Sequence, residues 1–355
     1  MKSLRVGFLL GLASATAGLA ALTTTTHAGL LSFGADADAG PRVTRAQVKA
    51  YLAQPTPALE EDAAEPAPKE CGARGPGVPD PFDLPVGWSS EVVRDGIPGV
   101  EAMALSDAGQ LYLGGRPDDA RRRVVSRLDP DGTLADSRTQ AEPDALAVDG
   151  LGQIWLGSYD ILKTLGPPEA GPDRIRHQLA DGGNIDDVAV TARGERVWIA
   201  MRDGRVVEVV GDQERPVVPF GDTTLLAVDH DDDLWVARSE TAGWWLYQLD
   251  GTRPRAWQKV DELVPELVSV RELSWGPDGA LYLLTEVRQR DPLVIVRWHP
   301  DDPARVNTWA AGLASVDATV GSLAWDTASQ CLYLSSSDAG KVYRTCPCVT
   351  GLAEG

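Results

Sequence analysis

From about residue 86 onward, short apolar blocks alternate with polar turns along the chain. Each block is about five residues long, which suits a β-strand better than a helix. Two blocks joined by a polar turn make one predicted hairpin, and this unit recurs in register. The six copies are EAMALSDAGQLYLG (101–114), DALAVDGLGQIWLG (144–157), DDVAVTARGERVWIA (186–200), TLLAVDHDDDLWVA (224–237), RELSWGPDGALYLL (271–284) and GSLAWDTASQCLYLS (321–335).

The second strand of each copy carries an aromatic anchor, which we interpret as a packing residue between blades. These anchors recur every 37 to 51 residues, the range of four-stranded propeller blades, and they are Tyr112, Trp155, Trp198, Trp235, Tyr282 and Tyr333. A third strand follows each anchor, and five copies also have a fourth, such as residues 215–221. The sixth copy lacks its fourth strand, but residues 89–96 precede the first copy and can supply it. We therefore predict an all-β fold, a six-bladed β-propeller of four-stranded antiparallel blades closed by an N-terminal strand.

The sequence before the propeller differs in composition from the repeats. Lys2 and Arg5 precede an apolar run at 6–22, and small residues end at Ala28, as in a secretory signal peptide. An uncleaved anchor is the alternative. The next segment is rich in Pro, Ala and Glu, which favours an extended linker. The predicted organisation is a signal peptide at 1–28, a linker at 29–85 with a short helix at 44–53, the propeller at 86–348 and a C-terminal tail at 349–355.

Four cysteines fit an exported protein with two disulfides. Cys331 and Cys346 are equidistant from the turn at 337–340 and are expected to face each other across the last hairpin. Cys71 and Cys348 would then form the second pair. A one-residue bulge would exchange Cys346 for Cys348. A metal site is the other interpretation, although CPC without a second close pair is poor zinc spacing.

Charge limits the partners of the protein. The chain has 52 acidic and 33 basic side chains, a net charge of −19, which argues against nucleic acid and anionic lipid as partners. An acidic solvated surface is one interpretation and cation binding is another. We expect a monomer that is secreted or periplasmic, has no membrane span after signal cleavage, and binds a small molecule, glycan or protein at a propeller face.

Candidate chemistry lies where the innermost strand of each blade begins, because these ends meet at one mouth of the central channel. The residues at this level are Glu101, Asp144, Asp186, Thr224, Arg271 and Gly321. Converging carboxylates suit a divalent cation such as calcium, so Glu101, Asp144 and Asp186 are predicted metal ligands, with Asn184 as a further oxygen donor. Two alternatives remain open: Arg271 forms a channel ion-pair network with Glu101 and Asp144, or the acids cap turns.

Three other sequence features give weaker indications of function. The segment VDHDDDLW (228–235) has calcium-loop spacing but occupies a turn that every other blade makes without it. The turn GLGQ (150–153) joins two strands and lacks the helix N-terminus that a phosphate site needs. The four histidines fall in unrelated parts of the repeat, which argues against a histidine-dependent triad; they are His27, His177, His230 and His299.

The repeat register, and PDALAVDGLGQIWLG (143–157) in particular, resembles the six-bladed propellers of the SMP-30/gluconolactonase-like and NHL-repeat superfamily. In SMP-30-type lactonases, a divalent metal is held at the channel mouth by an acid, an asparagine and an aspartate. The resemblance implies that Glu101 is the acid of the first blade and that Asp144 is the aspartate. Arg271 stands in the blade where that aspartate is expected, and no strand start carries the asparagine.

Two functions follow from these patterns. The first is an exported module that binds a ligand or a protein through its channel mouth. The second is a metal-dependent lactonase or esterase, in which a metal polarises the carbonyl and Asp144 or Asp186 acts in catalysis. We favour the binding module, because the ligand set of the lactonases is incomplete in this chain.

Overall fold

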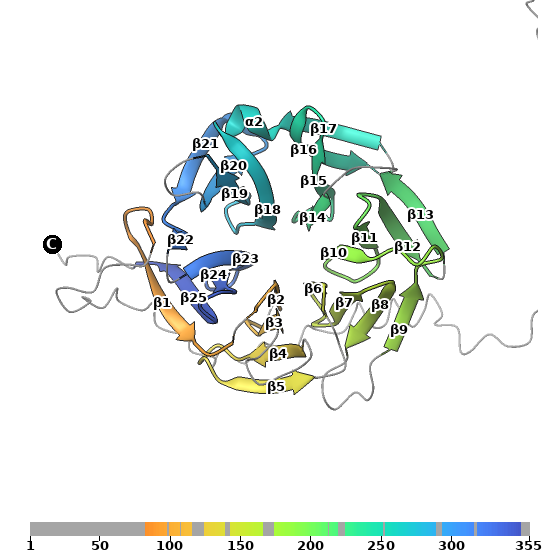
Figure 1. The fold of residues 1–355 in the computed structure, drawn as a ribbon, viewed down its shortest axis with the longest axis horizontal. Coiled ribbons are helices and arrows are strands. Elements are labelled where there is room, and N and C mark those ends of the chain that lie inside the picture. The colour runs from red at the N-terminus through yellow and green to blue at the C-terminus, as the bar shows by residue number, and fades with distance from the viewer. Residues whose placement is uncertain are drawn as a thin grey trace, which may run out of the picture. The chain divides into compact units, whose positions relative to one another are not determined.

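The repeated hairpins fold into six blades arranged in a ring around a central opening (Figure 1). The computed structural model describes residues 82–348 apart from 98, 107, 116–123, 139–142, 166–173, 212, 219–223, 251–252, 289–292 and 316–317. The predicted signal peptide, the helix at 44–53, Cys71 and the C-terminal tail lie outside the described residues.

Each blade is an antiparallel sheet, and in blades 1 to 5 the first strand in sequence lies innermost, whereas in blade 6 the N-terminal strand lies outermost. Blade 1 contains β2 (Ala102–Leu105), β3 (Leu111–Gly115), β4 (Val124–Leu128) and β5 (Leu134–Arg138). Blade 2 contains β6 (Ala145–Val148), β7 (Ile154–Ser158), β8 (Ile161–Leu165) and β9 (Arg174–Gln178). Blade 3 contains β10 (Ile185–Val190), β11 (Val197–Met201), β12 (Val206–Val210) and β13 (Gln213–Val218).

The second half of the ring repeats this order. Blade 4 contains β14 (Thr224–Val228), β15 (Leu234–Glu240), β16 (Gly243–Asp250) and β17 (Arg253–Lys259). A short helix, α2 (Val260–Leu263), leads to blade 5, which contains β18 (Leu267–Trp275), β19 (Leu281–Val287), β20 (Leu293–His299) and β21 (Asp302–Ala310). Blade 6 contains β23 (Ala318–Asp326), β24 (Cys331–Ser336), β25 (Lys341–Pro347) and β1 (Trp88–Arg94), with the short β22 (Ala314–Ser315) beside β23.

The ring is closed by the N-terminal strand, as the missing fourth strand of the sixth copy predicts. Strand β1 pairs antiparallel with β25 from Trp88 opposite Pro347 to Arg94 opposite Val342. Residues just before β1, which fall in the predicted linker, also contact the propeller. Phe82 is buried against Tyr343, with ring centroids 4.8 Å apart, and the backbone N–H of Asp83 donates to the carbonyl of Ala311 at 3.0 Å.

Apolar side chains gather into six clusters, one at each contact between neighbouring blades. Most aromatic anchors are buried there, as predicted; Trp198 is fully buried and Trp235 and Tyr282 are nearly so. The apolar surface that drives folding is therefore removed from water between blades, and the channel keeps room for polar groups.

The inner hairpins all turn through one residue in the left-handed backbone region. This residue is glycine in the first, second, third and fifth blades, including Gly152 (φ 76°) of the GLGQ turn, whereas Asp232 has φ 63° in the fourth and Gln330 has φ 56° in the sixth. Glycine adopts this conformation without the steric cost that a Cβ atom brings. The glycine of GLGQ thus has a backbone role.

The last hairpin contains the predicted disulfide between Cys331 and Cys346. Cys348 is also disulfide-bonded, and no cysteine among the described residues is free. Within the described part of the chain, no helix is long and apolar enough to cross a membrane.

Candidate functional site

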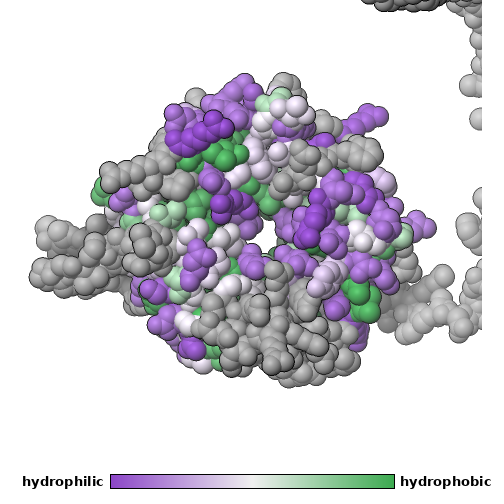
Figure 2. Space-filling view, viewed as in Figure 1, coloured by the Kyte–Doolittle hydropathy of each residue, from purple (hydrophilic) through white to green (hydrophobic). Residues whose placement is uncertain are grey.

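The central channel holds a cavity of about 300 Å³. Its wall is built from all six inner strands, and Figure 2 shows the hollow at the centre of one face with hydrophilic residues along part of its rim. We call the end where the inner strands begin the start mouth, and the end where the inner hairpins turn the turn mouth. The apolar part of the wall is contributed mainly by Met103, Leu146, Val148, Val188, Leu226, Val228, Leu273 and Leu323, with Trp275 and Trp325 near the turn mouth.

Three acids line this cavity, and two of them, Asp187 and Glu272, lie inside the inner strands β10 and β18. Each of these two follows a residue that the strand pairing skips. In blade 3, Ile185 pairs with Met201 and Asp187 with Ala200, so that Asp186 is bulged out. In blade 5, Val270 pairs with Thr285 and Glu272 with Leu284, so that Arg271 is bulged out. A bulge of this kind re-aims the side chains that follow it.

Asp187 is fixed by two backbone amides, one from its own strand and one from the neighbouring blade 4. Its Oδ1 accepts from the N–H of Val188 at 2.8 Å, and its Oδ2 accepts from the N–H of Leu226 in β14 at 2.7 Å. Burial is the largest influence on this carboxyl and raises its pKa to about 7, against the opposing effect of the two amides. Asp187 is therefore held rigidly in the wall while its charged form is disfavoured.

Glu272 of blade 5 contacts the next blade in the ring, blade 6. Its Oε2 accepts from the hydroxyl of Ser322 in β23 at 3.2 Å. Burial raises the pKa of Glu272 to about 8, and the charge of Asp187 raises it further, which places the two carboxyls in one electrostatic site. No Lys or Arg side chain is among the described residues that line the cavity.

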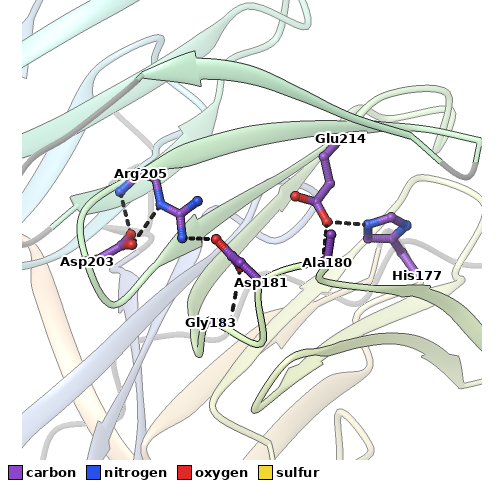
Figure 3. Close-up of polar contacts among 7 residues, drawn as sticks. All are labelled: His177, Ala180, Asp181, Gly183, Asp203, Arg205 and Glu214. Carbon is purple, nitrogen blue, oxygen red and sulfur yellow. Dashed lines mark hydrogen bonds and ion pairs between the residues drawn. The ribbon is translucent and has the colours of Figure 1, made fainter.

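The chain segment that leads into Asp187 is anchored by contacts at the edge of blades 2 and 3 (Figure 3). Arg205 forms ion pairs with Asp181 and Asp203. Glu214 accepts from the backbone N–H of Ala180 at 2.8 Å and contacts Nε2 of His177 at 2.9 Å. These contacts hold the connection between β9 and β10 from both sides, just before the bulge at Asp186.

The acids predicted at the start mouth are not among the described residues that line the cavity, and Asp144 and Asp186 contact other groups. Glu101 is exposed. Oδ2 of Asp144 accepts from the backbone N–H of Tyr159 at 3.0 Å. Asp186 forms an ion pair with Arg202 at 3.0 Å, and the carbonyl of Asn184 accepts from the backbone N–H of Arg202 at 2.8 Å.

Two of the three other positions predicted for the mouth, Thr224 and Arg271, also have local partners. Thr224 donates its hydroxyl to the carbonyl of Gly204 at 3.1 Å. Arg271 pairs with Glu286 of its own blade at 2.7 Å. Among the described residues, no three His, Cys, Asp or Glu side chains are grouped as metal ligands. The cation site at Glu101, Asp144, Asp186 and Asn184 stays a prediction.

The Asp-rich turn at 228–235 has a structural explanation. Oδ1 of Asp229 accepts from the backbone N–H groups of Asp231 and Asp233 at 3.0 and 2.9 Å, and Oδ2 accepts from Nε1 of Trp235 at 2.9 Å. Asp149 makes the same three kinds of contact in blade 2. Both carboxylates therefore cap their own hairpin and fix its aromatic anchor.

Asp187 and Glu272 were missed by an alignment of strand starts, because they stand one residue after Asp186 and Arg271. The signal was present as two adjacent charged residues at the start of the inner strand, Asp-Asp in blade 3 and Arg-Glu in blade 5. Adjacent residues of a strand point to opposite sides. The first residue of each pair therefore forms an ion pair, and the second lines the cavity.

Comparisons with known proteins confirm the predicted fold, a six-bladed β-propeller, as the class of this protein. No family model matches the chain, and no curated protein matches it by sequence. Similar solved structures include a gluconolactonase from Xanthomonas campestris, at TM-score 0.58 and 14% identity, over 76% of this chain and 97% of that one. The PQQ domain of a pyranose dehydrogenase from Coprinopsis cinerea has TM-score 0.56 and 14% identity, over 76% of this chain and 98% of that one.

A carbohydrate-active enzyme from Trichoderma reesei is a third similar structure, at TM-score 0.54 and 12% identity, over 77% of this chain and 100% of that one. At such low identities the likeness establishes the fold and carries no residue-level correspondence. Because one propeller fold hosts many functions, the function has to be argued from the site itself.

Proposed function

We propose that this protein is a binding module that takes up a small molecule in its central cavity. The observation that carries the proposal is the pair of carboxyls, Asp187 and Glu272, in a cavity of about 300 Å³ whose lining combines polar groups with apolar side chains. Cavities of this size that combine apolar walls with a few fixed polar groups are typical of small-molecule sites. Carboxyls with strongly shifted pKa values in a cavity also point to function rather than to stability.

The proposal is tested with a panel of small compounds that covers neutral, anionic and cationic classes. Binding is followed by isothermal titration calorimetry and by the shift in melting temperature. The Val228→Phe variant fills the cavity, since Val228 is half-buried and lines its wall. The matched control is Val210→Phe at an exposed position of β12, where the side chain is 55% exposed.

We expect at least one class of compound to bind the native protein and the Val210→Phe control but not Val228→Phe. Binding that is equally strong in Val228→Phe would place the ligand elsewhere and refute the proposal. The absence of binding by every class would refute it as well.

We further propose that the protein acts in an oxidising compartment, as a secreted or periplasmic protein. The disulfide between Cys331 and Cys346 supports this location, because such bonds persist outside the reducing cytosol. Fractionation of cells that express the full chain tests it, and recovery of the protein only from the cytosol with reduced thiols would contradict it.

A further inference from the structure

We propose that the ligand of the central cavity is a small organic cation, an ammonium group carried on an apolar body. This inference rests on the proposed function and specifies its ligand class. It follows from the charge of the wall, from the contrast between neighbouring side chains, and from the distribution of apolar groups.

The acidic groups of the wall have no Lys or Arg partner among the described residues that line the cavity. Within the described part of the chain, Asp187 accepts hydrogen bonds from two backbone amides, and Glu272 accepts one from the neutral hydroxyl of Ser322. The third acid that lines the cavity, Asp326, caps its own turn by accepting from the backbone N–H groups of Ala328 and Ser329. His230, the one histidine among the described lining residues, lies at the turn mouth and contacts the carbonyl of Gly276 at 3.2 Å.

The residues just before the two carboxyls, unlike the carboxyls themselves, have ion-pair partners among the described residues. Asp186 pairs with Arg202, and Arg271 pairs with Glu286, all on the rim. Among the described residues, counter-charges are thus found one residue away from Asp187 and Glu272 but not for these two carboxyls. Two carboxyls that share a cavity without a cation are costly to ionise. A cationic ligand would stabilise their ionised forms.

The geometry suits an ammonium group better than a bare metal ion. The carboxyls come from blades 3 and 5, and between them blade 4 contributes the apolar Leu226 to the wall. An ammonium group donates three hydrogen bonds and accepts none, which fits two acceptors on separate strands. Leu273 and Trp275 continue the wall from Glu272 toward the turn mouth and offer an apolar surface, and an indole face also attracts a cation. A divalent ion would prefer six or more oxygen ligands.

Binding of such a cation is linked to proton release. Because burial raises the pKa values of both carboxyls, the empty cavity holds protons near neutral pH. An ammonium ion that binds between them favours the ionised carboxylates, and the displaced protons pass to the solvent. The affinity for the cation should therefore increase as pH rises from 6 to 8.

The experiment uses three probes of nearly equal size and different charge: 2-phenylethylammonium, 2-phenylethanol and phenylacetate. Isothermal titration calorimetry of the full chain is done at pH 6 and pH 8, in buffers of different ionisation enthalpy, so that released protons are counted. The same titrations are run on Glu272→Gln and on the matched control Glu286→Gln, whose carboxylate pairs with Arg271 on the rim. Calcium alone is a separate titrant.

We expect the ammonium probe to bind at least tenfold more tightly than the alcohol at pH 8, more weakly at pH 6, and with proton release. Glu272→Gln should weaken it at least tenfold, whereas Glu286→Gln should not. If the alcohol or phenylacetate binds as tightly and Val228→Phe still abolishes binding, the inference fails and the proposed function stands. If calcium binds in place of the ammonium probe, the ligand class is wrong; if no probe binds, both proposals fail.

Discussion

Replacement of Glu272 by Gln should stabilise the folded protein at alkaline pH. The change keeps the size of the side chain and an oxygen acceptor for the Ser322 hydroxyl, but removes the charge. The pKa of Glu272 lies at about 8 in the folded state, above its ordinary value, because burial and the charge of Asp187 disfavour ionisation. The folded state therefore holds an extra proton between roughly pH 4.5 and pH 8, and stability falls as pH rises through that window.

The magnitude follows from the shift. One pKa unit corresponds to about 1.4 kcal/mol, so a pKa raised from 4.5 to about 8 sets an upper limit on the order of 5 kcal/mol. Because Glu272 is only half-buried, solvent screens its charge, which reduces the expected gain to about 2 kcal/mol at pH 8. At pH 5 the native carboxyl is already protonated, and the substitution should change stability by less than about 0.5 kcal/mol.

The assay is urea unfolding followed by tryptophan fluorescence at pH 5 and pH 8. The control is Glu286→Gln, because the Arg271 guanidinium lowers the pKa of Glu286 and reverses the sign. A lowered pKa contributes stability above the ordinary pKa and loses it on acidification, so this variant should be destabilised at pH 8 by up to about 1 kcal/mol. The reasoning is refuted if Glu272→Gln loses stability at pH 8, or if both variants respond to pH with the same sign.

Three other predictions concern the turn of blade 4, the rim and the disulfides. Asp232→Gly should change the free energy of unfolding by less than about 0.5 kcal/mol, because glycine relieves the backbone strain at φ 63° and this offsets the lost hydrogen bond from the N–H of Ala192. Asp232→Ala keeps the strain and loses the hydrogen bond, so it should cost about 2 kcal/mol. Equal urea midpoints for the two variants would contradict this. If the rim acids bind calcium, calcium should raise the melting temperature and Asp144→Ala should abolish the shift; no shift in the native protein counts against the site. Peptide mapping without reduction should recover Cys331 linked to Cys346 and Cys71 linked to Cys348, and a Cys331–Cys348 peptide would instead support the alternative pairing.

Hydropathy patterning was sufficient to predict the ring. Six copies of one hairpin cannot each bury an apolar face alone, so they stack, and the missing fourth strand of the sixth copy leaves residues 89–96 to close the circle. The disulfide across the last hairpin followed from symmetry about the turn at 337–340. These features depend on period and spacing, which the sequence records directly.

The site depends on a register detail that patterning does not record. An alignment of the repeats compares equivalent positions and selects Asp186 and Arg271, but a bulge in β10 and another in β18 set these residues aside from the ladder. The bulged residues find counter-charges on the rim in Arg202 and Glu286, and the residues that follow them line the channel. Neighbouring side chains of one strand therefore differ electrostatically. The first forms an ion pair, whereas burial raises the pKa of the second. Two adjacent charged residues at a strand start therefore indicate, in this ring, that the second of them lines the channel beside a bulge.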